Sequence, residues 1–210
     1  YKDSVNKKSI VIRNGLESFW LENKNNGKQI DLNQPINILC VGKIDKNKNI
    51  ETTINAIEIL IDEGYKVNFT VVGQVVDKEI HDKIINSKFT KVINYLPKEE
   101  LLKIYRQNDI YVMPSIYESF GRVYAEAMTQ GLPVIYSKGQ GFDGIFPDGV
   151  VGYSVPSKNP EYIADCIKRT IHHYSSISTA CIKYSDEFDW SNITVQLEQF
   201  YKKSMKRGEI

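Results

Sequence analysis

The stretch that decides the fold is INILCVGKIDKNKNIETTINAIEILIDEGYKVNFTVVG, residues 36–73. It opens at 36–42 on a continuous apolar run, typical of a strand that is covered on both faces. Four isoleucines then recur at spacings of four, three and four residues: Ile50, Ile54, Ile57 and Ile61. This period predicts an amphipathic helix that ends at Gly64. Since a second apolar run follows at 66–73, the order strand, helix, strand predicts a parallel βαβ unit.

The rest of the chain repeats this alternation. Further strands are predicted at 91–96, 109–115 and 133–137, and further helices at 77–87, 98–107, 121–131 and 159–173. We therefore predict an α/β fold with a doubly wound, mostly parallel, Rossmann-like sheet. We expect residues 1–35 to form an N-terminal linker segment, 36–175 the Rossmann-like domain, and 176–210 two C-terminal helices.

The composition is that of a globular domain, with 41% hydrophobic and 25% charged residues in 210. A net charge of +1 provides no basic field of the kind that attracts nucleic acid, so we expect no such partner. No signal peptide is visible in the opening residues YKDSVNKKSI, which lack an apolar core. The use of cysteine is typical of a reducing compartment, and we expect a cytoplasmic protein. The basic tail KKSMKRGEI (202–210) is more typical of a solvated helix end than of membrane contact. Peripheral contact with the inner face of the cell membrane stays open as the alternative.

Cysteine and histidine give no pattern of a metal site. The three cysteines, Cys40, Cys166 and Cys181, are odd in number, form no CxxC and lie in apolar patterns, so we expect small buried hydrophobes. The three histidines lack metal-ligand spacing, and we expect all of them in helices. We predict no metal site.

The chemically distinctive residues follow the predicted strands. The carboxyl ends of parallel strands meet at one edge of the sheet, where such folds bind ligands. After the first strand, Gly42 permits a sharp turn, and Lys43 and Lys48 can hold a diphosphate as point charges. After the fifth strand, three glycines in SKGQGFDG (137–144) permit close backbone approach to a ligand. A solvated basic loop and a plain flexible turn are the respective alternatives.

After the fourth strand, PSIYESFG (114–121) leads into a helix whose free N–H groups and dipole favour an anion. Gly121 has no side chain, so a phosphate can approach the backbone. Glu118 and Glu126 straddle this point, and each carboxylate can accept hydrogen bonds from two vicinal hydroxyls. We expect one acid to hold a ribose and the other a hexose, with the diphosphate between them. The alternative is a surface acid on the helix and a plain loop acid before it.

These motifs resemble those of the C-terminal, donor-binding domain of GT-B fold glycosyltransferases, specifically glycosyltransferase family 4, or group 1. The E-x7-E signature of that family is matched by ESFGRVYAE (118–126). Four further stretches resemble other family motifs: VIRNGLESFW (11–20), VGKIDKNKN (41–49), DGVVGYSV (148–155, a turn after the glycine loop) and FDWSNITVQLEQFY (188–201).

The resemblance implies a retaining hexosyltransferase with a UDP- or GDP-sugar donor, acting in bacterial surface polysaccharide synthesis. The expected catalytic residues are Glu118, Lys43 and Lys48. The expected donor-binding positions are Gly42, Tyr95, Leu96, Ser119, Phe120, Gly121, Arg122, Val123 and Glu126. Glu118 would contact the donor sugar, Glu126 the ribose, and the main chain near Tyr95 the base. The acceptor, a carbohydrate or a lipid-linked molecule, would bind to an N-terminal domain that this chain lacks, so the chain alone would bind donor and transfer little.

Three positions depart from the family pattern. Lys43 replaces the usual Arg, which keeps the charge but loses bidentate geometry. Arg122 stands where an apolar residue is common, and Asp143 stands near a frequent Glu. Other functions stay open at this point: half of a nucleotide-sugar epimerase, or a non-catalytic module that senses nucleotide-sugars. A receiver-type signalling domain would need paired acids after the first strand, where this chain has lysines.

Overall fold

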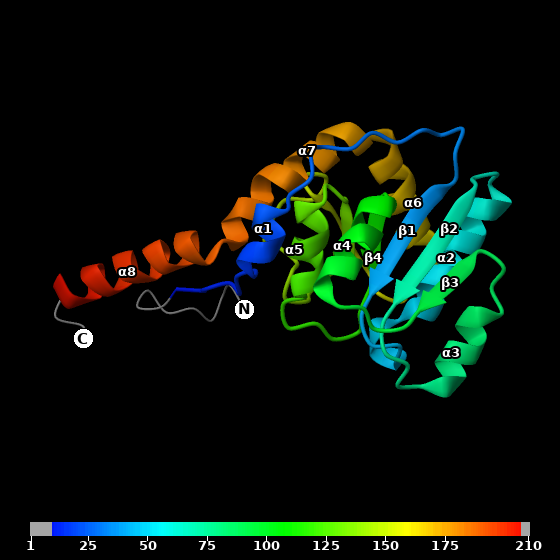
Figure 1. Cartoon of the computed structure of the whole chain (residues 1–210), viewed down its shortest axis with the longest axis horizontal. Coiled ribbons are helices and arrows are strands. Elements are labelled where there is room, and N and C mark those ends of the chain that lie inside the picture. The colour runs from blue at the N-terminus through cyan, green and yellow to red at the C-terminus, as the bar shows by residue number, and fades with distance from the viewer. Residues whose placement is uncertain (1–9, 207–210) are drawn as a thin grey trace.

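The computed structural model describes residues 10–206 of the chain (Figure 1). The first part of YKDSVNKKSI and the last four residues of the basic tail lie outside the described residues. The predicted doubly wound fold is confirmed, because six strands form one sheet in the order β3-β2-β1-β4-β5-β6 and every pair is parallel. The strands are β1 (Ile36–Val41), β2 (Val67–Val72), β3 (Thr90–Ile93), β4 (Ile110–Met113), β5 (Val134–Ser137) and β6 (Gly152–Val155).

The first five strands match predicted ones, whereas β6 was expected only as a turn. The strand has four residues and begins with a glycine, so it shows neither a long apolar run nor alternation. Gly152 has φ +145, and a Cβ added there would lie 1.8 Å from the carbonyl oxygen of Val134. Gly152 makes the strand hard to predict from the sequence, but the absence of a side chain there allows the backbone of β6 to lie against β5.

The helices cover both faces of the sheet. They are α1 (Ser18–Glu22), α2 (Ile50–Asp62), α3 (Lys78–Ile85), α4 (Lys98–Gln107), α5 (Arg122–Thr129), α6 (Pro160–His172), α7 (Tyr174–Tyr184) and α8 (Trp190–Lys206), with short 3-10 turns η2 (Lys46–Lys48) and η3 (Ser185–Phe188). Right-handed crossovers place α2 and α3 on one face, where α2 also packs on α6. They place α4 and α5 on the other face, where α5 packs on α1 and α7, and α8 extends away from the body (Figure 1).

The segment before β1 takes part in the core. We expected residues 1–35 to be a linker, and after α1 the chain up to Pro35 indeed has no helix or strand. However, Leu16 and Trp20 are 2% and 4% exposed, and the Leu16 amide donates to the carbonyl of Phe188 at 2.8 Å. The three-part division of the chain stays a prediction, but its outer parts share the hydrophobic core of the middle part.

The C-terminal helices are joined to the core in the same way. Helix α7 runs across the boundary expected at 175/176, and Ile177, Cys181 and Phe188 belong to the one buried cluster. All three cysteines are free and buried, as predicted. One histidine expectation is wrong: His173 lies between α6 and α7 as a cap rather than inside a helix. Within residues 10–206 no helix combines the length and apolarity that a membrane span requires.

The burial of Trp20 predicts how much the first helix contributes to stability. Trp20→Ala removes a ring that packs edge-on against Tyr105 at 5.5 Å, so we expect a loss of about 3–5 kcal/mol in the free energy of unfolding. Urea denaturation measures this loss. Tyr201→Ala, which truncates an aromatic ring that is 47% exposed on α8, is the control and should cost under about 1 kcal/mol. Equal small losses in both variants would show that α1 is not part of the folded unit.

Candidate functional site

The strand order creates a switch point between β1 and β4. Strand β1 pairs with β2 on one side and with β4 on the other, so the chain leaves the two central strands in opposite lateral directions. The loops that follow them, 42–49 and 114–121, therefore lie side by side at the carboxyl edge, where ligands bind in open α/β sheets. Asn47 joins the loops: its side chain donates to the carbonyl of Tyr117 at 3.0 Å and accepts from the Tyr117 amide at 2.9 Å.

The loop after β1 is an ordered turn, in which Lys43 and Lys46 are exposed and Lys48 is partly buried. The Asp45 side chain caps η2 by accepting from the Lys48 amide at 3.0 Å. Asn49 follows in the left-handed conformation with φ 54, and its side chain donates to the carbonyl of Pro114 at 3.0 Å. These contacts orient Lys48 toward the loop after β4.

Lys48 and Glu118 form an ion pair at the switch point. The Lys48 Nζ lies 2.8 Å from Glu118 Oε2, and the two side chains are only 18% and 14% exposed. The aliphatic part of Lys48 lies against Gly42, where an added Cβ would come within 3.1 Å of Cε. Lys43, the other expected phosphate ligand, is exposed and belongs to no ion pair within the described part of the chain. The structure thus brings together two of the three expected catalytic residues.

Helix α5 begins beside this pair without a capping side chain. Gly121 occupies the N-cap with φ 76, and among residues 10–206 the structure shows no side-chain cap at this helix start. The amides of Arg122 and Val123 in that turn lack intrahelical partners, so they can bind an anion. Gly121 is required on steric grounds too, because an added Cβ would lie 2.4 Å from the ring of Tyr124.

The neighbouring donor-site positions differ in exposure. Ser119 and Arg122 are exposed, while Phe120 is 7% exposed and packs on Phe142 and Phe188. Phe120 therefore anchors the loop in the core, and what it can offer a ligand is its backbone.

The glycine loop after β5 uses its glycines differently from what we expected. At Gly141 the close approach is to the protein itself, since an added Cβ would lie 1.8 Å from the carbonyl oxygen of Ser119. The Gly141 amide donates to the carbonyl of Glu118 at 2.8 Å, and Gln140 Oε1 accepts from the Glu118 amide at 2.9 Å. Asp143 accepts from the Gly139 amide at 2.7 Å. This loop holds the backbone of Glu118 in place.

Glu126 is not the surface acid that was the alternative. Its Oε2 accepts a hydrogen bond from the hydroxyl of Tyr105 at 3.2 Å. Burial raises the pKa of Glu126 to about 7, although the Tyr105 hydrogen bond and the positive charge of Arg122 lower it. A carboxyl group that is half ionised near neutral pH is typical of a binding or catalytic site.

Tyr95 and Leu96 lie farther from the ion pair. They follow β3, the outermost strand, so β2 and β1 separate them from the switch point. Tyr95 is 75% exposed, and Leu96 packs partly on the core. The structure places them on the same carboxyl edge of the sheet as the other site residues.

Sequence reasoning missed three residues of this site: Asn47, Gln140 and Tyr105. Asn47 lies in a motif whose lysines are the evident phosphate ligands, and Gln140 lies in one whose glycines dominate the pattern. Tyr105 shares the apolar face of α4 with Leu102, which predicts a core residue and gives no signal of a hydroxyl contact with α5.

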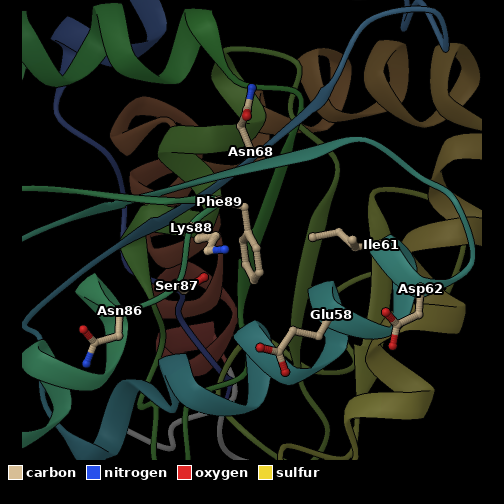
Figure 2. A pocket seen from close by; sticks show the side chains of 8 residues that line it. All are labelled: Glu58, Ile61, Asp62, Asn68, Asn86, Ser87, Lys88 and Phe89. Atoms are coloured by element: carbon tan, nitrogen blue, oxygen red, sulfur yellow. The ribbon is translucent and has the colours of Figure 1, made fainter.

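One depression in the surface lies away from the switch point. A depression of about 570 Å³ opens between α2 and the turn before β3, at the amino-terminal edge of the sheet. Figure 2 shows Lys88 and Phe89 on one side and Glu58, Ile61 and Asp62 on α2. Because ligands of this fold bind at the carboxyl edge, we do not assign this depression as the site. No three or more His, Cys, Asp or Glu side chains in residues 10–206 cluster closely enough to hold a metal ion.

The comparison with protein families agrees with the predicted fold. The family model described as "Glycosyl transferases group 1" matches residues 22–188. A relative from Klebsiella pneumoniae, an uncharacterized 41.2 kDa protein in the cps region, is 30% identical over 173 residues. That match covers 80% of this chain and 47% of the relative, so the chain spans about half the length of the curated relatives it matches.

Solved structures share the fold. HepE from Anabaena, crystallised in complex with UDP-glucose, superposes with a TM-score of 0.68 at 20% identity and covers 82% of this chain and 50% of that one. The C-terminal domain of LpcC, a group 1 glycosyl transferase family protein from Francisella tularensis, has a TM-score of 0.65 at 23% identity. That comparison covers 86% of this chain and 97% of the other.

Two glycines with nearly the same backbone conformation test the packing at the start of α5. Gly121 and Gly139 have φ values of 76 and 75, but an added Cβ meets the Tyr124 ring only at Gly121 and nothing within 4 Å at Gly139. Gly139→Ala should therefore cost about 1–2 kcal/mol of backbone strain alone. Gly121→Ala should cost about 1–3 kcal/mol more, because the Tyr124 ring must move. Urea denaturation of both variants measures the difference, and equal costs would contradict this packing.

Proposed function

The chain belongs to the group 1 glycosyl transferase family, and from this premise we propose that the switch-point site binds a nucleotide-sugar donor for transfer to an acceptor hydroxyl. The Lys48–Glu118 ion pair beside the uncapped start of α5 is the observation that carries the proposal. It combines a cation and free amides for a diphosphate with a carboxylate for sugar hydroxyls. The crystallised complex of HepE with UDP-glucose supports a donor of this chemical class.

Donor binding would exchange the partners of the ion pair. The diphosphate supplies oxygens for Lys48 and for the first amides of α5, while the hydroxyls of the donor sugar supply donors for Glu118. As the bond between the sugar and the diphosphate breaks, negative charge grows on the departing phosphate oxygens. Lys48 and the positive end of the α5 dipole stabilise that charge from fixed positions, which lowers the barrier without reorganisation. Exposed Lys43 would add a second cation.

The nucleoside would lie on the other side of the diphosphate. We assign the ribose hydroxyls to Glu126 and the base to the main chain near Tyr95 and Leu96. Contacts through the main chain fit a uridine or a guanosine nucleotide, so the donor is a UDP- or GDP-sugar. We propose a hexose that is transferred with retention of the anomeric configuration, as the family resemblance implies.

The complete reaction needs an acceptor site, which we propose lies on a second domain. The chain spans about half the length of its curated relatives, and a GT-B fold binds the acceptor on its other half. We propose a carbohydrate or lipid-linked acceptor in bacterial surface polysaccharide synthesis, at the cytoplasmic side of the membrane. The C-terminal stretch KKSMKRGEI (202–210), which includes the last residues of α8, is basic, and this suits contact with the inner face of that membrane.

Calorimetric titration of the chain with UDP-glucose and with GDP-mannose tests the donor site. We expect the wild type to bind one of them, and Lys48→Ala and Glu126→Ala each to weaken that binding roughly 10- to 100-fold. This is the equivalent of about 1.5–3 kcal/mol for a lost charge-assisted hydrogen bond.

The matched control is Lys88→Ala, which removes an exposed lysine from the depression of Figure 2 at the opposite edge. This variant should bind as the wild type does, and circular dichroism should confirm that all variants are folded. Full affinity in Lys48→Ala and Glu126→Ala, or a loss only in Lys88→Ala, would refute the assigned site.

A further inference from the structure

We propose that Tyr105 of α4 is a positioning residue that orients the Glu126 carboxylate for the ribose hydroxyls of the donor. The inference rests on the proposed function, because it requires Glu126 to hold the donor. Tyr105 itself touches no reacting group in this assignment and acts through Glu126.

The hydrogen bond between the two residues is partly buried. Tyr105 is 0% exposed, and its hydroxyl donates to Glu126 Oε2 at 3.2 Å. The carbonyl oxygen of Val123 lies farther away, at 3.4 Å. A buried phenol hydroxyl needs a hydrogen-bond acceptor for its single proton. A charged carboxylate is a stronger acceptor than a backbone carbonyl. The carboxylate is then anchored through Oε2. Within the described part of the chain no second donor to it is seen, so its other lone pairs can accept from two ligand hydroxyls.

Aromatic packing fixes the direction of the Tyr105 hydroxyl. Trp20 of α1 packs edge-on against the ring, with centroids 5.5 Å apart and an interplanar angle of 89°. Tyr111 of β4 lies against it at 6.2 Å. The ring is therefore held between α1 and the central sheet, so the position of Glu126 depends on three elements other than its own helix.

Charged groups from two elements act on the same carboxyl. Arg122, one turn earlier on α5, lowers the pKa of Glu126, and Glu17, the N-cap of α1, raises it. Glu17 is itself paired with Lys98 at 2.7 Å. Burial is the largest influence and sets the pKa at about 7. Only the ionised carboxylate accepts from both hydroxyls of a ribose, so donor affinity should rise with pH through neutrality.

Loss of the Tyr105 hydroxyl should change the pKa of Glu126 and therefore the affinity for the donor. Its hydrogen bond stabilises the ionised form of Glu126, so Tyr105→Phe should raise the pKa of Glu126 further. More of the variant is then protonated at pH 7, and less of it can bind the donor. A residue that only filled space would weaken binding by the same factor at every pH.

The test is a calorimetric titration with UDP-glucose and GDP-mannose between pH 6 and 8. Both phosphates of these donors are esterified and do not titrate in this range. Wild-type affinity should rise up to about tenfold from pH 6 to pH 8, as a group with a pKa of about 7 loses its proton. Tyr105→Phe should bind several-fold more weakly at pH 7, on the order of fivefold for a shift of about one pKa unit. Its deficit should be smaller at pH 8 than at pH 6.

Two further variants complete the experiment. Tyr174→Phe removes another buried tyrosine hydroxyl, which donates to the carbonyl of Asp109 at 3.0 Å at the amino-terminal edge. It should keep the wild-type affinity and pH profile. Glu126→Gln keeps the shape of the side chain but cannot titrate, and it should bind weakly with little dependence on pH.

The possible outcomes distinguish failure of the positioning role of Tyr105 from failure of the proposed function. If the wild type binds a donor and Tyr105→Phe has the same affinity and profile, or is weaker by one constant factor, the positioning role is overturned and the proposed function stands. If the wild type binds neither donor, the proposed function fails and takes this inference with it.

Discussion

The central position of β1 is the constraint on which the site depends. This strand pairs with β2 on one side and with β4 on the other, and both pairs are parallel. The two crossovers that leave β1 and β4 must therefore run in opposite directions, and their loops meet at one place on the carboxyl edge. Two contacts span that meeting point: the hydrogen bonds between the Asn47 side chain and the backbone of Tyr117, and the Lys48–Glu118 ion pair. A different strand order would leave the same motifs apart.

The ion pair is weak evidence for stabilisation, and the proposed function gives it a role in ligand binding. Charges that are largely removed from water cost desolvation energy, which their attraction offsets only in part. A pair of apolar side chains would fill the same space at a lower cost. Here the pair adjoins the start of α5, where Gly121 is the N-cap, and in the proposed function a diphosphate and a sugar would replace both partners with new hydrogen bonds. The loop that holds the backbone of Glu118 through Gln140 and Gly141 keeps this geometry in place.

The two acids of one sequence motif lie in different environments. Glu118 faces a lysine, whereas Glu126 faces a buried phenol and has a pKa raised to about 7. The first is paired with a cation that, in the proposed function, donor hydroxyls would replace. The second changes its protonation near neutral pH, so its use depends on what stabilises the ionised form. The sequence motif gives no sign that the two carboxyl groups differ in environment. The elements packed around each of them create that difference.

The sequence alone determined the α/β class, five of the six strands, the α5 start at Gly121 and the pair of acids around it. Each of these leaves a local mark: an apolar run, a helical period, a glycine before a helix. Only the tertiary structure decided the short strand β6, the burial of Trp20, the contact of Gly141 with Ser119 and the hydrogen bond from Tyr105 to Glu126. These join residues far apart in the chain or hidden in glycine-rich segments. Such contacts are set by strand order and side-chain packing. Neither of these leaves a repeating pattern in a single sequence.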